Sequence, residues 1–295
     1  MKNNNDSKYR FVAIGDIVID CIYDKENNLI TASGGGSKFN VITRLALYGN
    51  NTALISGCGN DEYGQKEISF LNSIGVDLKH TIIENVNTRI YELHKLKNGD
   101  YESKKKNWYK DSIVTFDNVL NNVKSDDVII MDSLHELDLN VIKKTSNKKV
   151  IDLGRDKIVK RFDNEQLSSI LTNNFEIIQV NENVYKALFE KIRAENIYDV
   201  YDFLQPKLLI VTYGSKGATF ITDNGFWNMP IKDPAKEIDA TGAGDAFFSV
   251  VIDAYFKNIL ENKYPDERYV SDTFERSLPV TKKVVLKLGA RGDLK

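Results

Sequence analysis

An acidic residue directly follows a glycine-rich turn in the stretch DATGAGDAFFSVVIDAYF, which runs from 239 to 256. Backbone amides at the start of a helix have no intrahelical partner and favour an anion there. Glycine also lets a charged group approach that backbone closely. The stretch therefore predicts an anion site at Gly242 and Gly244 with the carboxylate of Asp245 beside it. Transfer of a phosphoryl group to an alcohol needs both, because the amides stabilise the moving group while the carboxylate accepts the hydroxyl proton.

Three other interpretations compete with phosphoryl transfer. The letters GAGDAF begin like a dinucleotide-binding fingerprint, but Phe247 stands at the third glycine position and too little chain follows it. Gly59 and Gly64 have the spacing of a P-loop, but Gln65 stands where that motif requires lysine. The third interpretation, that Asp245 only complements the helix dipole, stays open on this stretch alone.

The composition excludes several other classes of function. The 295 residues include 40 Lys and Arg against 42 Asp and Glu, so we expect neither a nucleic-acid partner nor a membrane partner. Cys21, Cys58 and three scattered histidines form no zinc pattern, and two cysteines cannot build a disulfide framework. No apolar run approaches the roughly 20 residues of a membrane span. The polar start MKNNNDSKYR is unlike a signal peptide, so we expect a cytoplasmic protein.

Alternating strand and helix patterns surround the glycine turn. This rhythm predicts one α/β domain with a mostly parallel sheet. Strands are expected in 9–24 (broken at Gly15), 52–57, 127–132, 149–154, 175–180, 207–214, 218–222 and 225–230. Helices are expected in 37–49 with Ser37 as the N-cap, and in 62–75, 136–146, 157–172, 182–193, 243–257 and 269–288.

The segment from 88 to 106 has a different pattern. Two alternating runs flank Asn98-Gly99, which is the strongest short signal for a β-hairpin. We expect this hairpin to form a flap that pairs with strands in 17–32. Its exposed edge would also allow a homodimer in which two flaps pair.

These pieces together resemble the ribokinase-like, or PfkB, family of carbohydrate kinases. The family's signatures D-T-x-G-A-G-D-x-F and G-G-x-x-x-N correspond here to DATGAGDAF at 239–247 and GGSKFN at 35–40. Further family-like pieces follow the expected order, namely GNDEYG at 59–64, IGVD at 74–77, TYGSKG at 212–217 and KLGARG at 287–292. The resemblance implies a three-layer α/β/α sandwich with a mostly parallel central sheet and a small β-sheet lid. It implies one kinase domain over 1–295, with the lid formed by inserts near 17–33 and 87–112.

The resemblance also implies roles for individual residues. Asp245 would be the catalytic base, and the amides of Gly242, Ala243 and Gly244 would receive the γ-phosphate of ATP bound with Mg²⁺. The residues implied to contact the nucleotide are Thr212, Gly214, Gly217 and Asn181. Those implied to contact a sugar-like substrate are Asp16, Asp20, Gly35, Gly36 and Asn40. By their chemistry, Arg89 in the lid and Arg155 after a core strand could read an acidic or phosphorylated group of the substrate. Asp239 and Thr241 match positions that help to hold a monovalent cation such as K⁺ in relatives.

Structural explanations compete with these roles. Thr212, Gly214 and Gly217 could form a tight turn between strands, and Asn40 could cap or pack within its helix. Asp16 could be a turn former, and Asp239 a loop acid that nearby amides satisfy. Arg89 and Arg155 could be ordinary surface arginines.

The chain departs from the family pattern at a few positions. Relatives typically carry N-x-x-E, whose Glu helps to organise the magnesium–phosphate network, but Val184 stands at the Glu position after Asn181. Glu182 would point elsewhere on the helix. Val18 replaces an Asn of ribose-specific relatives, which argues against plain ribokinase activity. Pro279 is predicted to kink or end the last helix.

The sequence therefore predicts an ATP-dependent kinase that phosphorylates a hydroxyl group of a small carbohydrate or carbohydrate-like acceptor. Val184 motivates a second hypothesis, a sugar- or nucleotide-binding sensor with weak turnover. A third hypothesis, a nucleoside kinase on the same fold, keeps the chemistry and changes the acceptor.

Overall fold

Strand β1 (Arg10–Asp16) is apolar on both faces and explains how the molecule is layered. Its side chains alternate, so that Phe11 and Ala13 belong to one apolar core while Val12 and Ile14 belong to another. A parallel strand that helices cover on both sides needs such a continuous apolar run. The sheet must therefore lie between two layers of helices.

The computed structural model describes residues 9–96, 101–109, 111–261 and 263–294. In this part of the chain, a nine-stranded sheet has the order β13-β12-β11-β10-β9-β8-β1-β4-β5. Neighbouring strands are parallel except β11–β12 and β12–β13, which are antiparallel. The other strands are β4 (Thr52–Gly59), β5 (Asp77–Glu84), β8 (Asp127–Met131), β9 (Lys148–Leu153), β10 (Ile177–Asn181), β11 (Leu208–Thr212), β12 (Gly217–Thr222) and β13 (Gly225–Pro230).

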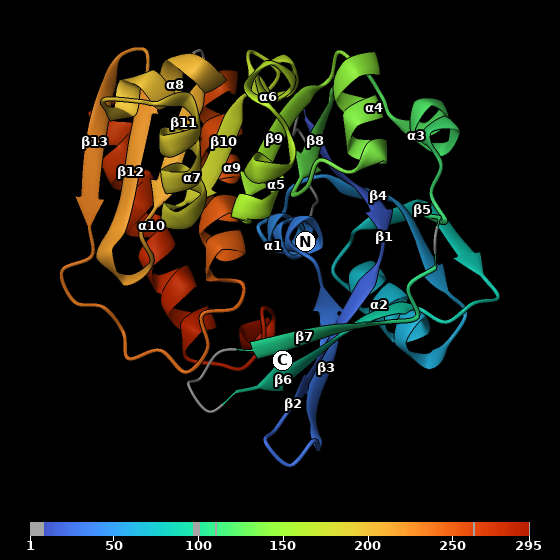
Figure 1. Ribbon diagram of the computed structural model, residues 1–295. Coiled ribbons are helices and arrows are strands. Elements are labelled where there is room, and N and C mark those ends of the chain that lie inside the picture. The colour runs from blue at the N-terminus through green and yellow to red at the C-terminus, as the bar shows by residue number, and fades with distance from the viewer. Residues whose placement is uncertain (1–8, 97–100, 110, 262, 295) are drawn as a thin grey trace.

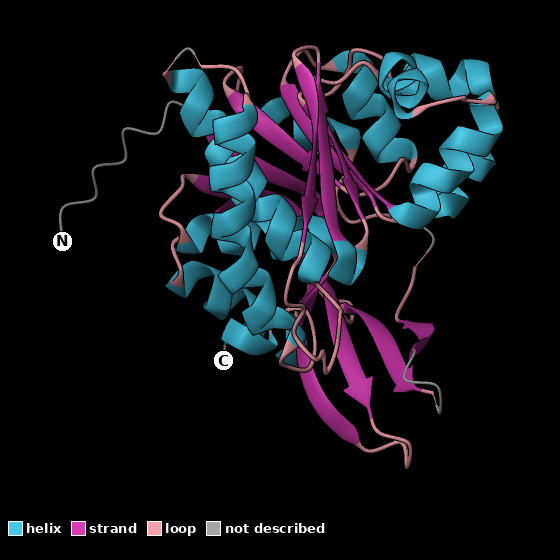
Figure 2. Cartoon of the chain, turned by 90° about the vertical axis from the view of Figure 1, so that its left-hand side faces the viewer, coloured by secondary structure: helices cyan, strands magenta, loops and turns pink. Residues whose placement is uncertain are grey.

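Helices cover both faces of this sheet, as Figure 2 shows. One core contains side chains of α1 (Ser37–Leu47), α2 (Glu62–Ser73), α9 (Ala243–Leu260) and α10 (Glu267–Val285). The other contains side chains of α3 (Phe116–Asn122), α4 (Glu136–Lys144), α5 (Asp156–Arg161), α6 (Asn164–Leu171), α7 (Glu182–Ile192) and α8 (Ile197–Leu204). The predicted three-layer α/β/α architecture is confirmed.

A second, four-stranded sheet extends below the large one in Figure 1. Its order is β3-β2-β6-β7, from β2 (Val18–Tyr23), β3 (Leu29–Gly35), β6 (Arg89–Lys95) and β7 (Tyr101–Lys106). Strand β2 pairs antiparallel with β3 and parallel with β6, so the hairpin strand β6 does pair with a strand in 17–32 as predicted. The strands β6 and β7 are antiparallel, but the turn predicted at Asn98-Gly99 lies outside the described residues.

Several local predictions were wrong. The N-cap of α1 is Gly36, whose φ of 83° suits glycine, and Ser37 is the first helical residue. The single helix expected in 157–172 is two helices, because Asp163 starts α6 with a capping box. Helix α10 continues through Pro279 to Val285, so Pro279 does not end the helix. The elements α3, α8 and β5 are present in the structure but were not predicted from the sequence.

Within the described ranges, no helix combines the length and the apolar character that crossing a bilayer requires.

A buried ion pair fixes β1 against β8. Arg10 donates from Nε to Oδ1 of Asp127 over 2.8 Å and from Nη2 to Oδ2 over 2.7 Å. Removing one partner of such a pair leaves an uncompensated buried charge. We expect Asp127→Ala to lower the free energy of unfolding by about 3 kcal/mol in urea denaturation. The matched Lys66→Ala removes an exposed ion pair with Glu62 and should change stability very little. Equal effects of the two substitutions would contradict this account.

Candidate active site

The carboxylate of Asp245 lies at the start of α9 and is held by α1. Asp245 is 9% exposed. Its Oδ1 accepts a hydrogen bond from Ser37 Oγ at 2.5 Å, and its Oδ2 accepts one from Asn40 Nδ2 at 2.7 Å. Burial raises the pKa of Asp245, while these two hydrogen bonds oppose the rise. A carboxylate whose pKa is raised toward neutrality is a stronger proton acceptor than an ordinary exposed aspartate.

The glycine turn before Asp245 leaves amides available for an anion. Gly242 has a φ of 80°, and a Cβ added there would lie 2.5 Å from the Cβ of Ala290. The amide of Ala243 donates to the carbonyl of Ala240 at 3.1 Å. Within the described residues, the amides of Gly242 and Gly244 donate to no protein acceptor. Of the three amides that the resemblance implies, the turn itself therefore uses one and leaves two.

Asp20 of β2 offers a second carboxylate near Asp245. It packs against Gly35, where any side chain would collide with the carboxyl group. Asp20 has no hydrogen-bond partner in the described part of the chain, so its oxygens are available to an incoming hydroxyl group. Burial raises the pKa of Asp20 to about 7, and Arg291 and Arg155 act against this rise. Arg155 itself is exposed at the N-cap of α5.

Two polar residues of the central sheet also belong to the site, and the sequence analysis did not name them. Burial raises the pKa of Asp152 in β9 to about 8, and the charge of Asp245 adds to the rise. Gln179 of β10 donates from Nε2 to the carbonyl of Gly244 at 3.3 Å. Its Oε1 is buried without a partner among the described residues. A polar residue inside an otherwise apolar strand is the sequence signal from which Asp152 and Gln179 could have been identified.

A buried arginine near the end of the chain reaches the same site. Arg291 is 3% exposed, and its Nε donates to Oδ1 of Asn40 at 2.9 Å. Its Nη1 pairs with the carboxylate of Glu67 in α2. Arg291 lies in the family-like stretch KLGARG, which by itself predicts no role for this residue.

Asp16 and Arg89, both predicted to contact the substrate, bind each other. Arg89 Nη2 lies 2.9 Å from Asp16 Oδ2. Asp16 also accepts from the amide of Ile113 at 3.1 Å, and Arg89 lies over the rings of Trp108 and Tyr109. These contacts fasten the lid to the end of β1, and they agree with a structural role for Asp16.

Both carboxylate oxygens of Asp239 accept hydrogen bonds from its own loop and from two other segments. Its Oδ1 accepts from the amide of Thr241 at 2.9 Å and from the Thr241 hydroxyl at 2.6 Å. Its Oδ2 accepts from the amide of Gly289 at 2.8 Å and from the Tyr101 hydroxyl at 3.4 Å. Burial and this carboxylate raise the pKa of Tyr101 to about 12. The described residues contain no cluster of three or more His, Cys, Asp or Glu side chains suited to a metal ion.

A cavity of about 610 Å³ adjoins the glycine turn. Thr212, Gly214 and Gly217 line it, as do Gly244 and Phe247. Its other wall is α10, which contributes residues from 274 to 285. A cavity of this volume that is lined by the glycine turn suits a nucleotide with its phosphates at that turn.

Asn181 does not line this cavity. Its Oδ1 accepts from the amide of Val184 at 3.0 Å as the N-cap of α7, and its Nδ2 donates to the carbonyl of Gly154 at 2.8 Å. The sequence had placed Asn181 at the nucleotide, whereas these contacts use both ends of its side-chain amide.

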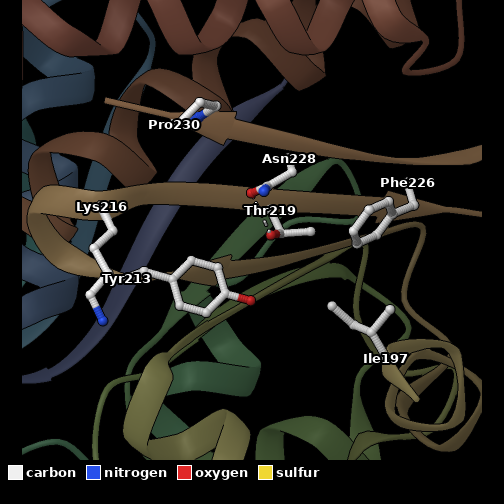
Figure 3. A pocket seen from close by; sticks show the side chains of 7 residues that line it. All are labelled: Ile197, Tyr213, Lys216, Thr219, Phe226, Asn228 and Pro230. Atoms are coloured by element: carbon white, nitrogen blue, oxygen red, sulfur yellow. Dashed lines mark hydrogen bonds between the residues drawn. The ribbon is translucent and has the colours of Figure 1, made fainter. Parts of the chain in front are cut away.

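A second hollow, of about 400 Å³, lies beside β12 and β13. Figure 3 shows Ile197, Tyr213, Lys216 and Phe226 around a hydrogen bond of 3.3 Å between Thr219 and Asn228. None of the predicted site residues lines this hollow.

Val184 and Glu182 supply no carboxylate to the phosphate side of the site. Val184 is 0% exposed and belongs to the core beneath α7. Glu182 pairs with Lys186 at 2.9 Å and with Lys216 at 3.7 Å, and it does not line the cavity beside the glycine turn. Position 184 therefore offers no carboxylate for a magnesium–phosphate network.

We expect Val184→Glu to lower the free energy of unfolding by about 3 kcal/mol or more without raising kcat, because it buries a carboxylate in an apolar core. Urea denaturation and steady-state kinetics measure the two effects. Asn183→Glu, at the exposed neighbouring position, should leave stability unchanged. A Val184→Glu protein that folds normally and turns over faster would show that this position faces the phosphates.

Asp152 makes the stability depend on pH. Its pKa of about 8 in the folded protein lies above the ordinary value of 3.8, which the unfolded chain has. Between these values the folded state binds the proton more tightly, so its stability falls as pH rises toward 8. We expect the melting temperature of Asp152→Asn to exceed that of the wild type by a margin that grows from pH 5 to pH 8. The exposed Asp126→Asn should show a constant margin, and a constant margin for Asp152→Asn as well would refute the assignment.

Known proteins share the sequence and the fold. The chain is 26% identical over 269 residues to an ATP-dependent 6-phosphofructokinase from Thermoanaerobacterium thermosaccharolyticum, which covers 83% of this chain and 81% of that relative. The structure of adenosine kinase from Sinorhizobium meliloti has a TM-score of 0.77 at 15% identity, over 96% of this chain and 95% of that chain. A fructokinase double mutant from Vibrio cholerae, solved with fructose, ADP and a potassium ion, has a TM-score of 0.75 at 18% identity, over 98% and 96%.

The likeness to these solved structures shows the fold alone. The family model is the stronger finding, because the model of the pfkB family of carbohydrate kinases matches residues 8–292 of this chain. This range includes both glycine signatures, the lid and the cavity that ends at the glycine turn. The chain therefore belongs to the pfkB carbohydrate kinase family, whose members are ATP-binding transferases, and it has the ribokinase-like fold.

Proposed function

We propose that this kinase transfers the γ-phosphate of ATP to a hydroxyl group of a small carbohydrate or carbohydrate-like acceptor, with Asp245 as the base. One observation supports this most strongly: Ser37 and Asn40 hold the carboxylate of Asp245 directly after two unpaired amides. A base and a phosphate cradle within one turn of chain suit attack by an alcohol on a phosphoryl group.

The proposed step is an in-line transfer. The acceptor hydroxyl gives its proton to a carboxylate oxygen of Asp245, and its oxygen forms a bond to the γ-phosphorus. The bond between that phosphorus and the bridging oxygen breaks, and ADP leaves. The amides of Gly242 and Gly244 donate hydrogen bonds to the transferring group, where charge is spread over its outer oxygens.

ATP would occupy the cavity that Thr212, Gly214 and Gly217 line, with its phosphates at Gly244. The family uses ATP with a divalent metal, and Mg²⁺ would neutralise phosphate charge when bound. Asp239 and Thr241 remain our proposed neighbours of a monovalent cation such as K⁺. Their side chains already bond each other, so such an ion would need backbone carbonyls as ligands.

The acceptor would lie between the lid and α1. Asp20 has free carboxylate oxygens for sugar hydroxyls, and the missing side chain of Gly35 lets that carboxyl group pack against the backbone. Gly36 remains our proposed neighbour of the acceptor through its backbone. Asn40 would contact the acceptor with the amide hydrogen that Asp245 does not use. Arg155, exposed at the rim, would read an acidic or phosphorylated group if the acceptor carries one.

We further infer that residues 1–295 act as one kinase domain and that closure of the small sheet excludes water during transfer. The two edges of this sheet differ. Strand β7 carries the exposed run Lys104–Lys106, which discourages pairing with another strand, whereas β3 exposes Leu29 and Ile30 at 47% each. A homodimer through the lid would therefore use the side of β3.

Two other functions have specific support. The buried Val184 favours a sugar- or nucleotide-binding sensor with weak turnover. The fold shared with adenosine kinase allows a nucleoside as the acceptor. Both functions would use the same site, so the identity of the acceptor and the rate of phosphate transfer distinguish them.

The decisive test follows ADP release from MgATP across a panel of sugars, sugar acids, sugar phosphates and nucleosides. We expect one acceptor class to stimulate release, and Asp245→Asn to lower kcat by about 10²–10⁴-fold because the base is lost. Calorimetry should find ATP binding retained in that variant. Asp272→Asn, an exposed acid on α10, is the matched control and should match the wild type.

Stimulation by nucleosides alone would identify a nucleoside kinase. Binding of a sugar or of ATP without stimulation by any acceptor would establish the sensor instead.

A further inference from the structure

A continuous chain of polar contacts leads from the end of the protein to the proposed base. Arg291 precedes the short 3₁₀ turn Gly292–Leu294 and donates from Nε to Oδ1 of Asn40 at 2.9 Å. Asn40 donates from Nδ2 to Oδ2 of Asp245 at 2.7 Å. Arg291 and Asn40 are each 3% exposed, so water does not compete strongly for these contacts.

The orientation of the Asn40 amide decides what Asp245 meets. The amide group of Asn donates hydrogen bonds, and its carbonyl only accepts them. An arginine only donates. With Arg291 on the carbonyl side, the NH₂ group must face Asp245. Without Arg291 the amide could turn, and its carbonyl oxygen would then face the carboxylate and disfavour the charged form.

Arg291 is itself held in place. Its Nη1 pairs with Glu67, which is 6% exposed, and this pair passes close to Gly34. A side chain at position 34 would collide with both members of the pair. Arg291 Nη2 is buried and has no partner in the described residues. An unpaired buried donor costs stability, so the arrangement is not the one that stability alone would favour.

We propose that Arg291 is a positioning residue for the phosphotransfer reaction: it fixes the Asn40 amide so that Asn40 donates to the base. This inference rests on the proposed function of Asp245. Arg291 acts through Asn40 and does not itself touch the reacting atoms.

Other charged groups also act on Asp245 and must stay constant in any test. They come from every element packed around it, namely Asp20 in β2, Arg44 in α1, Asp132 after β8 and Asp152 in β9.

The first readout needs no turnover. In protein labelled with ¹³C at the aspartate carboxyls, NMR titration gives the pKa of Asp245, with the signal assigned from Asp245→Asn. We expect Arg291→Met to raise this pKa by about one unit, because the turned amide disfavours the carboxylate. Arg291→Lys keeps a donor and should recover part of the shift. If Arg291→Met folds poorly, Arg291→Met with Glu67→Gln removes the unpaired buried charge.

The second readout is the pH dependence of kcat. Its acidic limb should move to higher pH in Arg291→Met while KM for ATP stays constant. With Asn40→Ala already present, Arg291→Met should add no further change, since a residue that acts through Asn40 loses its effect when Asn40 is gone. The matched control is Arg10→Lys. Arg10 is also buried, at 7% exposed, and it binds Asp127 and the carbonyl of Asn122 rather than a residue of the site.

Arg10→Lys keeps the charge but loses the two-pronged contact with Asp127, so it should lower the melting temperature and leave the pKa of Asp245 unchanged. An unchanged pKa in Arg291→Met, or effects fully additive with Asn40→Ala, would overturn the inference. A pKa shift in a protein that phosphorylates no acceptor would support the contact chain and count against the proposed function instead.

Discussion

The contact between the start of α9 and the start of α1 is the constraint on which the rest of the structure depends. Asp245 bonds Ser37 and Asn40, which are 208 and 205 residues away in the chain. Two segments so distant meet only because β1 lies inside the large sheet and because α1 and α9 pack in the same helical layer (Figure 1). The positive φ angles of Gly36 and Gly242 then direct the starts of both helices toward the same place.

Holding several carboxylates in one buried place is the main electrostatic cost of this site. Asp20 and Asp152 both lie near Asp245, and the charge of Asp245 contributes to the raised pKa of each. Burial raises the pKa of all three, so none behaves as an ordinary surface acid. Such clusters are typical of functional sites rather than of cores built for stability. The Oε1 atom of Gln179 is likewise buried without a hydrogen-bond partner among the described residues, which a core built for stability would avoid.

Local sequence patterns predicted the mostly parallel α/β domain, the hairpin of the lid and the glycine turn, because each depends on residues close together in the chain. The three-layer arrangement came from the resemblance to the family. The contact of Ser37 could not be predicted, since its type and position equally suit an N-cap. Arg291 was missed because its partners, Asn40 and Glu67, lie in other elements. The break at Asp163 was hidden by an apolar pattern that continues across both helices. The burial of Val184 depends on how α7 rotates against the sheet, which a motif does not specify.

In the proposed transfer, the acceptor oxygen, the carboxylate of Asp245 and the amides of the glycine turn meet around one phosphorus atom. A crystal structure with ADP, aluminium fluoride and the stimulating acceptor tests this most directly. The account predicts that the fluoride ligands accept from the amides of Gly242 and Gly244 and that an acceptor hydroxyl lies within hydrogen-bond distance of Asp245. A fluoride group bound elsewhere, or an acceptor whose hydroxyl groups do not reach Asp245, would contradict it.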